Sequence, residues 1–215
     1  MDWRPDVAFA EFRDESGAVI PYGERWDMSP PDDSYSRTDH LERFEVAWTL
    51  ARALVDHLVA EYDVEVIDDV DTTESLAFPE RAPKPRAPIP GAPAAVRRLV
   101  PRGQGAPLTV VETDSPGVVM LAGATLEALA PVCGCDACDE NVEEMADSLE
   151  ELAFGIARGT AWEAIERRGV AGGIGARDTG SRSWSRLGWS DRRAARAAIK
   201  KAPAMAPWPT RASAG

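Results

Sequence analysis

The fold is decided by residues 41–62, which read LERFEVAWTLARALVDHLVAEY. Apolar side chains recur in this stretch at spacings of three and four, which is the pattern of an amphipathic helix of about six turns. The members of this stripe are Leu41, Phe44, Trp48, Ala51, Val55, Leu58 and Tyr62. Asp39 followed by Glu42 predicts a capping box at the start of the helix. A helix with one apolar face needs a second layer to cover it, so the flanking sequence is expected to supply a sheet.

Four segments that follow have the composition of β-strands. Residues 64–68 alternate apolar and polar side chains, and the segments 95–100, 108–113 and 118–122 are strongly apolar. An Asp-Ser-Pro-Gly turn at 114–117 predicts a hairpin between the last two. Six prolines within residues 79–93 predict a surface loop, because proline lacks the N–H that a sheet or helix needs. We therefore expect a small antiparallel sheet of about four strands.

A second amphipathic helix is predicted near residues 141–157, where Asn141 and Glu144 form another capping box. Residues 160–168 suit either a strand or a short helix. Residues 169–183 are rich in Gly and Ser and predict a loop, and Ser190 can cap a last helix that ends before Pro203. The expected fold class is α+β, with the sheet packed against two amphipathic helices. Residues 1–168 are expected to form an acidic α+β domain, and residues 169–215 a Gly/Ser-rich loop and basic C-terminal arm of the same domain.

Charge is divided unevenly along the chain. Residues 1–157 carry 12 Lys and Arg against 32 Asp and Glu, a net charge of −20, whereas residues 158–215 carry 12 against 4, a net charge of +8. The basic arm is expected to fold back on the acidic body, and the alternative is that it contacts nucleic acid or an acidic partner. No apolar run approaches the ~20 residues of a membrane span. With no secretory signal at the start, the expected location is the cytoplasm.

The stretch with the most chemical information is Cys133-Gly134-Cys135-Asp136-Ala137-Cys138-Asp139-Glu140. Cys135 and Cys138 have the two-residue gap of a zinc knuckle, and Gly134 permits a backbone conformation that turns Cys133 toward the same point. Cys133, Cys135 and Cys138 are therefore candidate ligands of one zinc ion. The fourth position is open to Asp136, Asp139, water or one of the two histidines, His40 and His57.

Two other interpretations of the cysteine loop stay open. Cys135 and Cys138 also form a dithiol that could exchange electrons, and the start of the following helix favours a thiolate. The many nearby carboxylates oppose thiolate formation and favour a bound cation, so sequence reasoning expects poorly nucleophilic thiols. The third interpretation is a packed, reduced loop in which small thiols fill a crowded turn.

No complete catalytic constellation occurs in the sequence. Residues 172–175, Gly-Gly-Ile-Gly, lack the third glycine and the preceding strand of a dinucleotide fingerprint. The C-terminal tryptophans at 184, 189 and 208 stand among arginines; we expect them to cover the core, although they could also stack on single-stranded nucleic acid. The favoured function is a non-enzymatic binding protein whose acidic body meets a basic protein partner. The alternative is an enzyme, either a zinc-dependent hydrolase or a thiol oxidoreductase.

Three stretches together resemble an actinobacterial protein family classed as a domain of unknown function. They are residues 22–26 (YGERW) with 30–37 (PPDDSYSR), residues 109–119 ending in DSPGVV, and residues 132–140 (VCGCDACDE). The closing Ala-Pro-Trp-Pro at 206–209 is similar to the ending of that family. The resemblance implies a single domain that contains the proline-rich segment, and it implies no particular activity.

Overall fold

The computed structural model describes residues 4, 13–19, 26, 28–39, 41–69, 91–138, 140–167, 169–177, 180–186, 193, 196–200 and 203–211 of the 215-residue chain. Within 181–186 it describes the backbone alone. The structure does not describe positions 79–90 of the proline-rich loop predicted at 79–93. Ser190, which was expected to cap the last helix, also lies outside the described residues.

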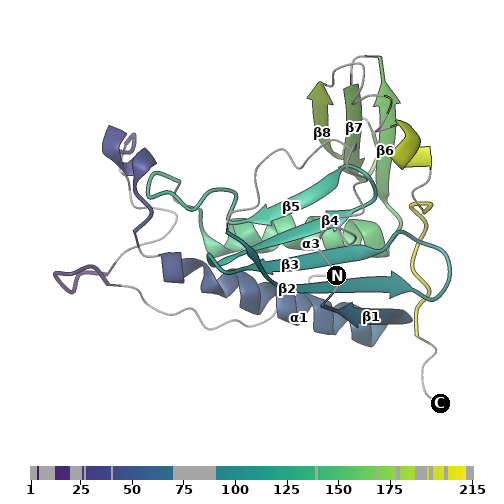
Figure 1. Ribbon diagram of the computed structural model, residues 1–215, viewed down its shortest axis with the longest axis horizontal. Coiled ribbons are helices and arrows are strands. Elements are labelled where there is room, and N and C mark those ends of the chain that lie inside the picture. Colours follow the sequence, from purple (N-terminus) through teal and green to yellow (C-terminus); the bar gives the residue numbers. More distant parts are fainter. Residues whose placement is uncertain are drawn as a thin grey trace.

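Five strands form the main sheet, an antiparallel meander in which every strand pairs with its neighbours in sequence (Figure 1). The strands are β1 (Val64–Asp68), β2 (Pro93–Pro101), β3 (Leu108–Thr113), β4 (Gly117–Ala122) and β5 (Leu126–Ala130). The predicted hairpin is present, since β3 and β4 pair from Leu108↔Ala122 to Thr113↔Gly117. The four predicted strands are confirmed, and β5 is an addition that sequence reasoning missed.

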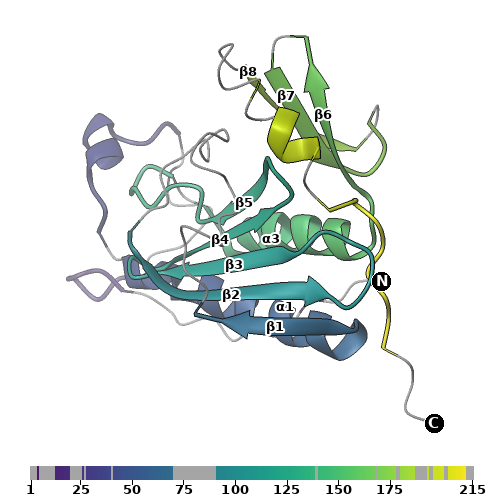
Figure 2. The same cartoon turned by 45° about the vertical axis from the view of Figure 1, so that its right-hand side comes forward.

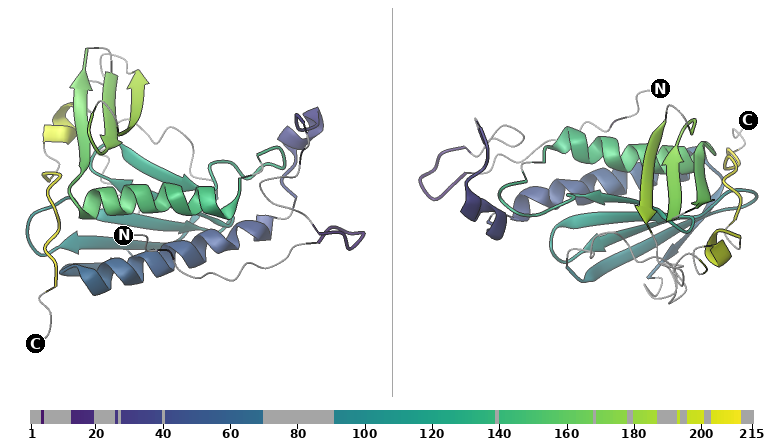
Figure 3. Two further views of the ribbon diagram at one scale, coloured as in Figure 1. Left: turned by 180° about the vertical axis from the view of Figure 1, so that it is seen from behind. Right: turned by 90° about the horizontal axis from the view of Figure 1, so that it is seen from above.

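Two helices, α1 (Val46–Glu61) and α3 (Val142–Ala157), cover one face of this sheet (Figure 3). Their apolar stripes meet the strand residues that point toward them, and together these side chains form the main core. The largest fully buried members are Phe44, Leu54, Leu58, Leu99, Leu108, Met120, Met145, Leu149 and Ile156. The expected α+β class, with a sheet against two amphipathic helices, is therefore confirmed.

Strand residues whose side chains point away from the helices form a second cluster on the other face of the sheet. Val111 and Val119 face each other there across β3 and β4, with Val96 and Leu121 beside them, and all four are buried. The directly preceding pair, Val110 and Met120, points to the helices. Burial on both faces explains why β3 and β4 are nearly continuous runs of apolar residues rather than alternating ones.

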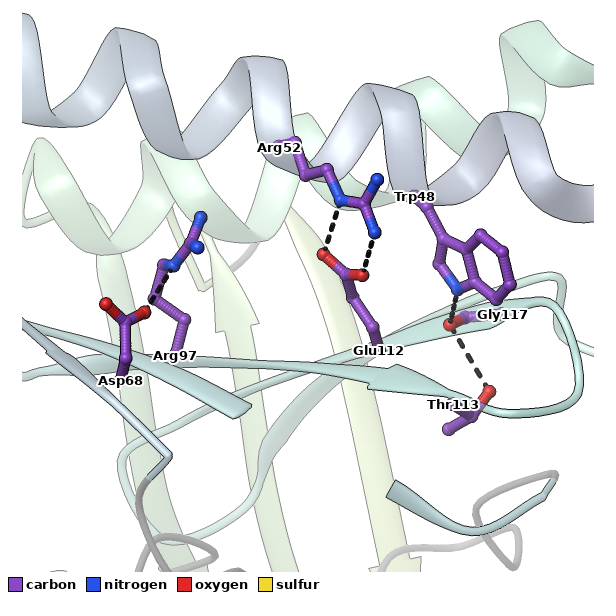
Figure 4. Close-up of polar contacts among 7 residues, drawn as sticks. All are labelled: Trp48, Arg52, Asp68, Arg97, Glu112, Thr113 and Gly117. Carbon is purple, nitrogen blue, oxygen red and sulfur yellow. Dashed lines mark hydrogen bonds and ion pairs between the residues drawn. The ribbon is translucent and has the colours of Figure 1, made fainter. Parts of the chain in front are cut away.

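Polar contacts fix α1 against the sheet (Figure 4). Trp48 Nε1 donates a hydrogen bond to the Gly117 carbonyl oxygen at 3.0 Å. One turn further along, Arg52 Nε donates to Glu112 Oε1 at 2.9 Å and forms an ion pair with it. These contacts set the position of α1 along the β3–β4 hairpin, which apolar packing alone specifies weakly.

The start of α1 differs from the prediction. Residues 41–45 form the 3-10 helix η2 (Leu41–Glu45), and the α-helix begins only at Val46, with no side-chain capping hydrogen bond. The capping box predicted from Asp39 and Glu42 is therefore wrong for α1. A short 3-10 turn is common before an α-helix, and here it allows Arg43 and Phe44 to be buried together. The second predicted box is confirmed, because Asn141 and Glu144 exchange both hydrogen bonds.

A second, three-stranded antiparallel sheet stands beyond one end of the first (Figure 2). Its strands are β6 (Ala161–Glu166), β7 (Gly169–Ile174) and β8 (Ser181–Arg186). The prediction of a loop at 169–183 is thus wrong for most of that range. β7 and the start of β8 lie within it, and β7 is the central strand, which pairs on both sides. The pairing of β6 with β7 crosses position 168, where the acidic body and the basic arm were divided. That both parts belong to one domain stays a prediction.

Glu163 on β6 ties the second sheet to the first. Its carboxylate accepts hydrogen bonds from the Ala124 N–H at 2.9 Å and from the Thr125 hydroxyl at 2.7 Å, both in the turn between β4 and β5. Burial raises the pKa of Glu163, and the hydrogen bonds from Thr125 and Ala124 oppose this rise by favouring the carboxylate. The side chain therefore acts as a cap for a turn whose backbone N–H groups would otherwise be buried unpaired.

Trp208 closes the core at the C-terminal end of α3. Its backbone N–H donates to the Ala157 carbonyl and its indole Nε1 to the Ala106 carbonyl, both at 2.8 Å. The ring is 3% exposed and packs edge-on against Tyr62, with ring centroids 5.7 Å apart. The expectation that the C-terminal tryptophans cover the core is confirmed for Trp208, whereas the side chains of the other two lie outside the described residues.

None of the helices in the described part of the chain has the length and apolar character needed to cross a membrane.

Gly159 should be essential for the way α3 ends. Its φ of 69° lies in the left-handed region, and a Cβ there would meet the backbone of Ala206 and Pro207. We expect Gly159→Ala to lower the free energy of unfolding by about 1–3 kcal/mol in chemical denaturation. Gly103→Ala is the matched control, because its Cβ would make an ordinary contact, 3.5 Å from Pro209, and it should change stability by less than about 0.5 kcal/mol. Equal effects of the two substitutions would contradict the role given to Gly159.

Candidate metal centre

The cysteine loop joins β5 to α3. It begins after Pro131 and ends at the Asn141 cap of the helix. The N–H of Cys138 donates to the Cys135 carbonyl at 3.1 Å, so residues 135–138 form a tight turn. Glu140 closes the loop across its base, where its Oε2 accepts a hydrogen bond from the Val132 N–H at 2.7 Å. The loop is therefore a closed structure with its own internal hydrogen bonds.

The structure brings together all three cysteines that sequence reasoning proposed as ligands. The sulfur atoms of Cys133, Cys135 and Cys138 all lie within 4.8 Å of one another, and those of Cys133 and Cys135 are 3.3 Å apart. Zn–S bonds of about 2.3 Å in a tetrahedral site place neighbouring sulfurs about 3.8 Å apart, which lies between these two distances. All three cysteines are free thiols, with Cys135 buried and the other two half-buried. Their spacing is close enough to hold one metal ion.

The candidates for a fourth ligand are separated by the fold. Asp136 is 2% exposed, and its Oδ1 accepts a hydrogen bond from the Asp39 N–H at 3.0 Å, while Oδ2 lies 3.9 Å from Arg37 Nε. His57 packs edge-on against Phe154 near the far end of α3, about 18 Å along the helix from Val142. His57 is therefore too far from the three sulfurs to be the fourth ligand. His40 and Asp139 lie outside the described residues.

Two arginines that are distant in sequence lie beside the loop, and sequence reasoning missed them. Arg43 is 3% exposed and donates to the Cys135 carbonyl at 3.4 Å, while its guanidinium stacks on Phe44. Arg37 faces Asp136. A signal for Arg43 was available, because it precedes Ala47 by four residues and so shares the helical stripe that is buried. The surroundings of the sulfurs are thus less negative than the local sequence indicates.

The thiols differ in acidity. Burial alone would raise the pKa of Cys135, but hydrogen bonding from the thiols of Cys133 and Cys138, with the backbone N–H groups of Cys138 and Ala137 close to the sulfur, outweighs burial and lowers it. Burial, together with hydrogen bonds that the Cys138 thiol donates to the sulfurs of Cys135 and Cys133, raises the pKa of Cys138 to about 12. Sequence reasoning expected carboxylates to suppress ionisation of every thiol. The shifts instead arise from burial and from hydrogen bonds at sulfur, and they have opposite signs.

A separate cavity of about 900 Å³ lies along the C-terminal half of α3. Its lining includes Asp147, Glu150, Phe154 and Arg158, and Arg4 forms ion pairs with both acids. The cysteine loop precedes the opposite end of the helix, so the cavity is no part of the metal centre. Glu151 also lines the cavity, and its side chain is exposed.

Comparison with protein families gives a match over most of the chain. The sequence model of a family of unknown function, DUF6226, matches residues 8–212. The chain belongs to this family. The match covers both sheets, both helices and the cysteine loop, and it confirms the expected membership of a family of unknown function. No curated protein and no solved structure matched the chain.

The opposite pKa shifts predict a two-stage titration of the metal-free protein. Because the chain has only three cysteines, all in this loop, the pH dependence of their alkylation, followed by mass spectrometry, reports on the thiolates of this site. The first thiolate should form below the ordinary pKa of 9.0 and the last near pH 12. Cys135→Ser should remove the early step, whereas Cys138→Ser should remove the late one. A single step with three equivalent thiols near pH 9 would contradict the assigned hydrogen bonds.

Proposed function

We propose that the protein binds one zinc ion through the thiolates of Cys133, Cys135 and Cys138, and that this ion stabilises the cysteine loop. The observation that carries the proposal is the convergence of the three sulfurs within 4.8 Å. Thiolates are soft ligands that select zinc, copper(I) or iron–sulfur clusters. Zinc is favoured because it accepts a tetrahedral site without redox chemistry, and three thiolates leave one position for water or for a side chain outside the described residues.

A structural role for the ion is supported by how the loop is built. Its turn is held by backbone hydrogen bonds and by the buried Arg43 and Asp136, and Cys135 is itself buried. A catalytic zinc needs access for a substrate and a group that moves protons, and the described residues beside the sulfurs supply no such pair. A reducing compartment would keep the three thiols available, which is consistent with the expected cytoplasmic location.

A thiol oxidoreductase is the second candidate. It is favoured by the 3.3 Å contact between the sulfurs of Cys133 and Cys135 and by the lowered pKa of Cys135. Against it, Cys135 is the most buried of the three cysteines, which limits the approach of a disulfide substrate. Zinc binding would also hold the same thiols in a non-reactive state.

Metal analysis tests the proposal. Protein purified without added zinc should contain about one zinc per chain, and Cys135→Ser should contain almost none. Val132→Ser is the matched control, because this exposed residue directly precedes Cys133 and carries no ligand. Free zinc at about 100 times its Kd should raise the free energy of unfolding by about 2.7 kcal/mol in the wild type and leave Cys135→Ser unchanged. Three freely titrating thiols without metal would exclude the zinc model and leave the packed loop or the dithiol.

We also propose that the acidic body contacts a basic protein partner. Support comes from the net charge of −20 over residues 1–157 and from α3, where Glu143, Glu144, Asp147 and Glu151 are exposed. Capture with the zinc-loaded protein should recover proteins of net positive charge that dissociate as salt is raised. The double variant Glu143→Gln/Glu151→Gln should retain less of them, and Gly103→Ala should retain the same amount. Recovery of acidic proteins or of nucleic acid alone would count against this proposal.

A further inference from the structure

The turn that carries two of the three sulfurs also holds another segment of the chain. The Asp136 N–H donates to the Arg37 carbonyl at 2.9 Å, and the Ala137 N–H donates to the Ser34 carbonyl at 3.2 Å. The Asp39 N–H returns a hydrogen bond to the Asp136 carboxylate. Residues 136 and 137 are the two positions between Cys135 and Cys138. The backbone that a metal ion would fix is therefore the backbone to which residues 34–39 are bound.

Within the part of the chain that the structure describes, this segment has little other support. It contains the 3-10 helix η1 (Asp32–Ser36), which stands apart from the sheet and its helices (Figure 1). Between residues 31 and 39, Ser34 alone is buried, and the side chains of the other residues are exposed. Segments with few buried apolar contacts open at low free-energy cost. Attachment of residues 31–39 therefore depends on the geometry of the 135–138 turn.

We propose that occupancy of the three-cysteine site controls the docking of residues 31–39. Binding of a metal ion at the loop would then attach this segment more firmly to the 135–138 turn. The inference rests on the proposed zinc site. An ion that fixes the positions of Cys135 and Cys138 presents the N–H groups of Asp136 and Ala137 in the orientation that the Arg37 and Ser34 carbonyls need. Linkage is reciprocal: the docked segment must raise the affinity for the ion by the same factor by which the ion favours docking.

Limited trypsin digestion, followed by mass spectrometry, measures docking directly. Cleavage after Arg37 requires the segment to leave the turn, because the Arg37 carbonyl is bound to Asp136. We expect one equivalent of zinc to slow this cleavage about tenfold in the wild type. Cleavage after Arg102, in the turn between β2 and β3, is the internal control and should keep its rate. In Cys135→Ser, zinc should have no effect on either site.

Ser34→Ala tests reciprocity without altering a ligand. The buried Ser34 hydroxyl donates to the carbonyl of Pro31, the residue before η1, at 2.6 Å, so its loss should loosen the segment while the sulfurs and the turn stay intact. Cleavage after Arg37 in the zinc-loaded protein should accelerate, and the affinity for zinc should fall severalfold. Ser148→Ala, on α3 and away from the loop, should change neither quantity.

The outcomes separate this inference from the proposed function. Zinc binding at one equivalent with an unchanged rate of cleavage after Arg37 would overturn the coupling and leave the zinc site standing. Absence of zinc binding would overturn both. Slower cleavage on zinc binding, lost in Cys135→Ser, together with weaker zinc binding in Ser34→Ala, is the result that the coupling requires.

Discussion

Packing of two helices against one face of a five-stranded meander is the constraint on which the other parts of the molecule depend. The apolar sides of α1 and α3 bury Leu99, Leu108 and Met120 of the sheet, and apolar burial of this kind is the dominant favourable term in folding. Because α3 must lie beside α1 in this layer, the connection from β5 has to turn sharply. That connection is the cysteine loop, and its position next to η2 follows from the two helices being neighbours.

Periodicity predicted the parts of the fold that are held by apolar burial. The stripes of the two helices, the four strands and the Asn141 cap were all evident, because each element has a pattern that matches its own period. The strand β5 was missed although Leu126, Ala128 and Ala130 alternate as buried residues. Its composition of leucine, alanine and glutamate favours helix, and pairing with β4 overrides that preference.

The second sheet could not be predicted by the same means. β7 contains three glycines among its six residues, a composition that is typical of loops. It is a strand because β6 and β8 pair with it on both sides, and the absence of a Cβ at Gly172 allows Leu126 of β5 to approach. The site was predictable in its three ligands, which are close in sequence. Arg37 and Arg43 reach it only through the tertiary fold, and so the electrostatics derived from neighbouring residues alone were incomplete.

The position of Trp208 has a consequence for how the chain folds during synthesis. The indole lies in the core between Tyr62 and Ala106, although it is more than 100 positions away from both along the chain. A growing chain that ends before this residue has already made both helices and the whole main sheet, yet the end of its core beside Tyr62 stays open to water. The nascent protein therefore exposes apolar surface until Trp208 has left the ribosome and packed beside Tyr62, and it is in this interval that protection against aggregation matters most.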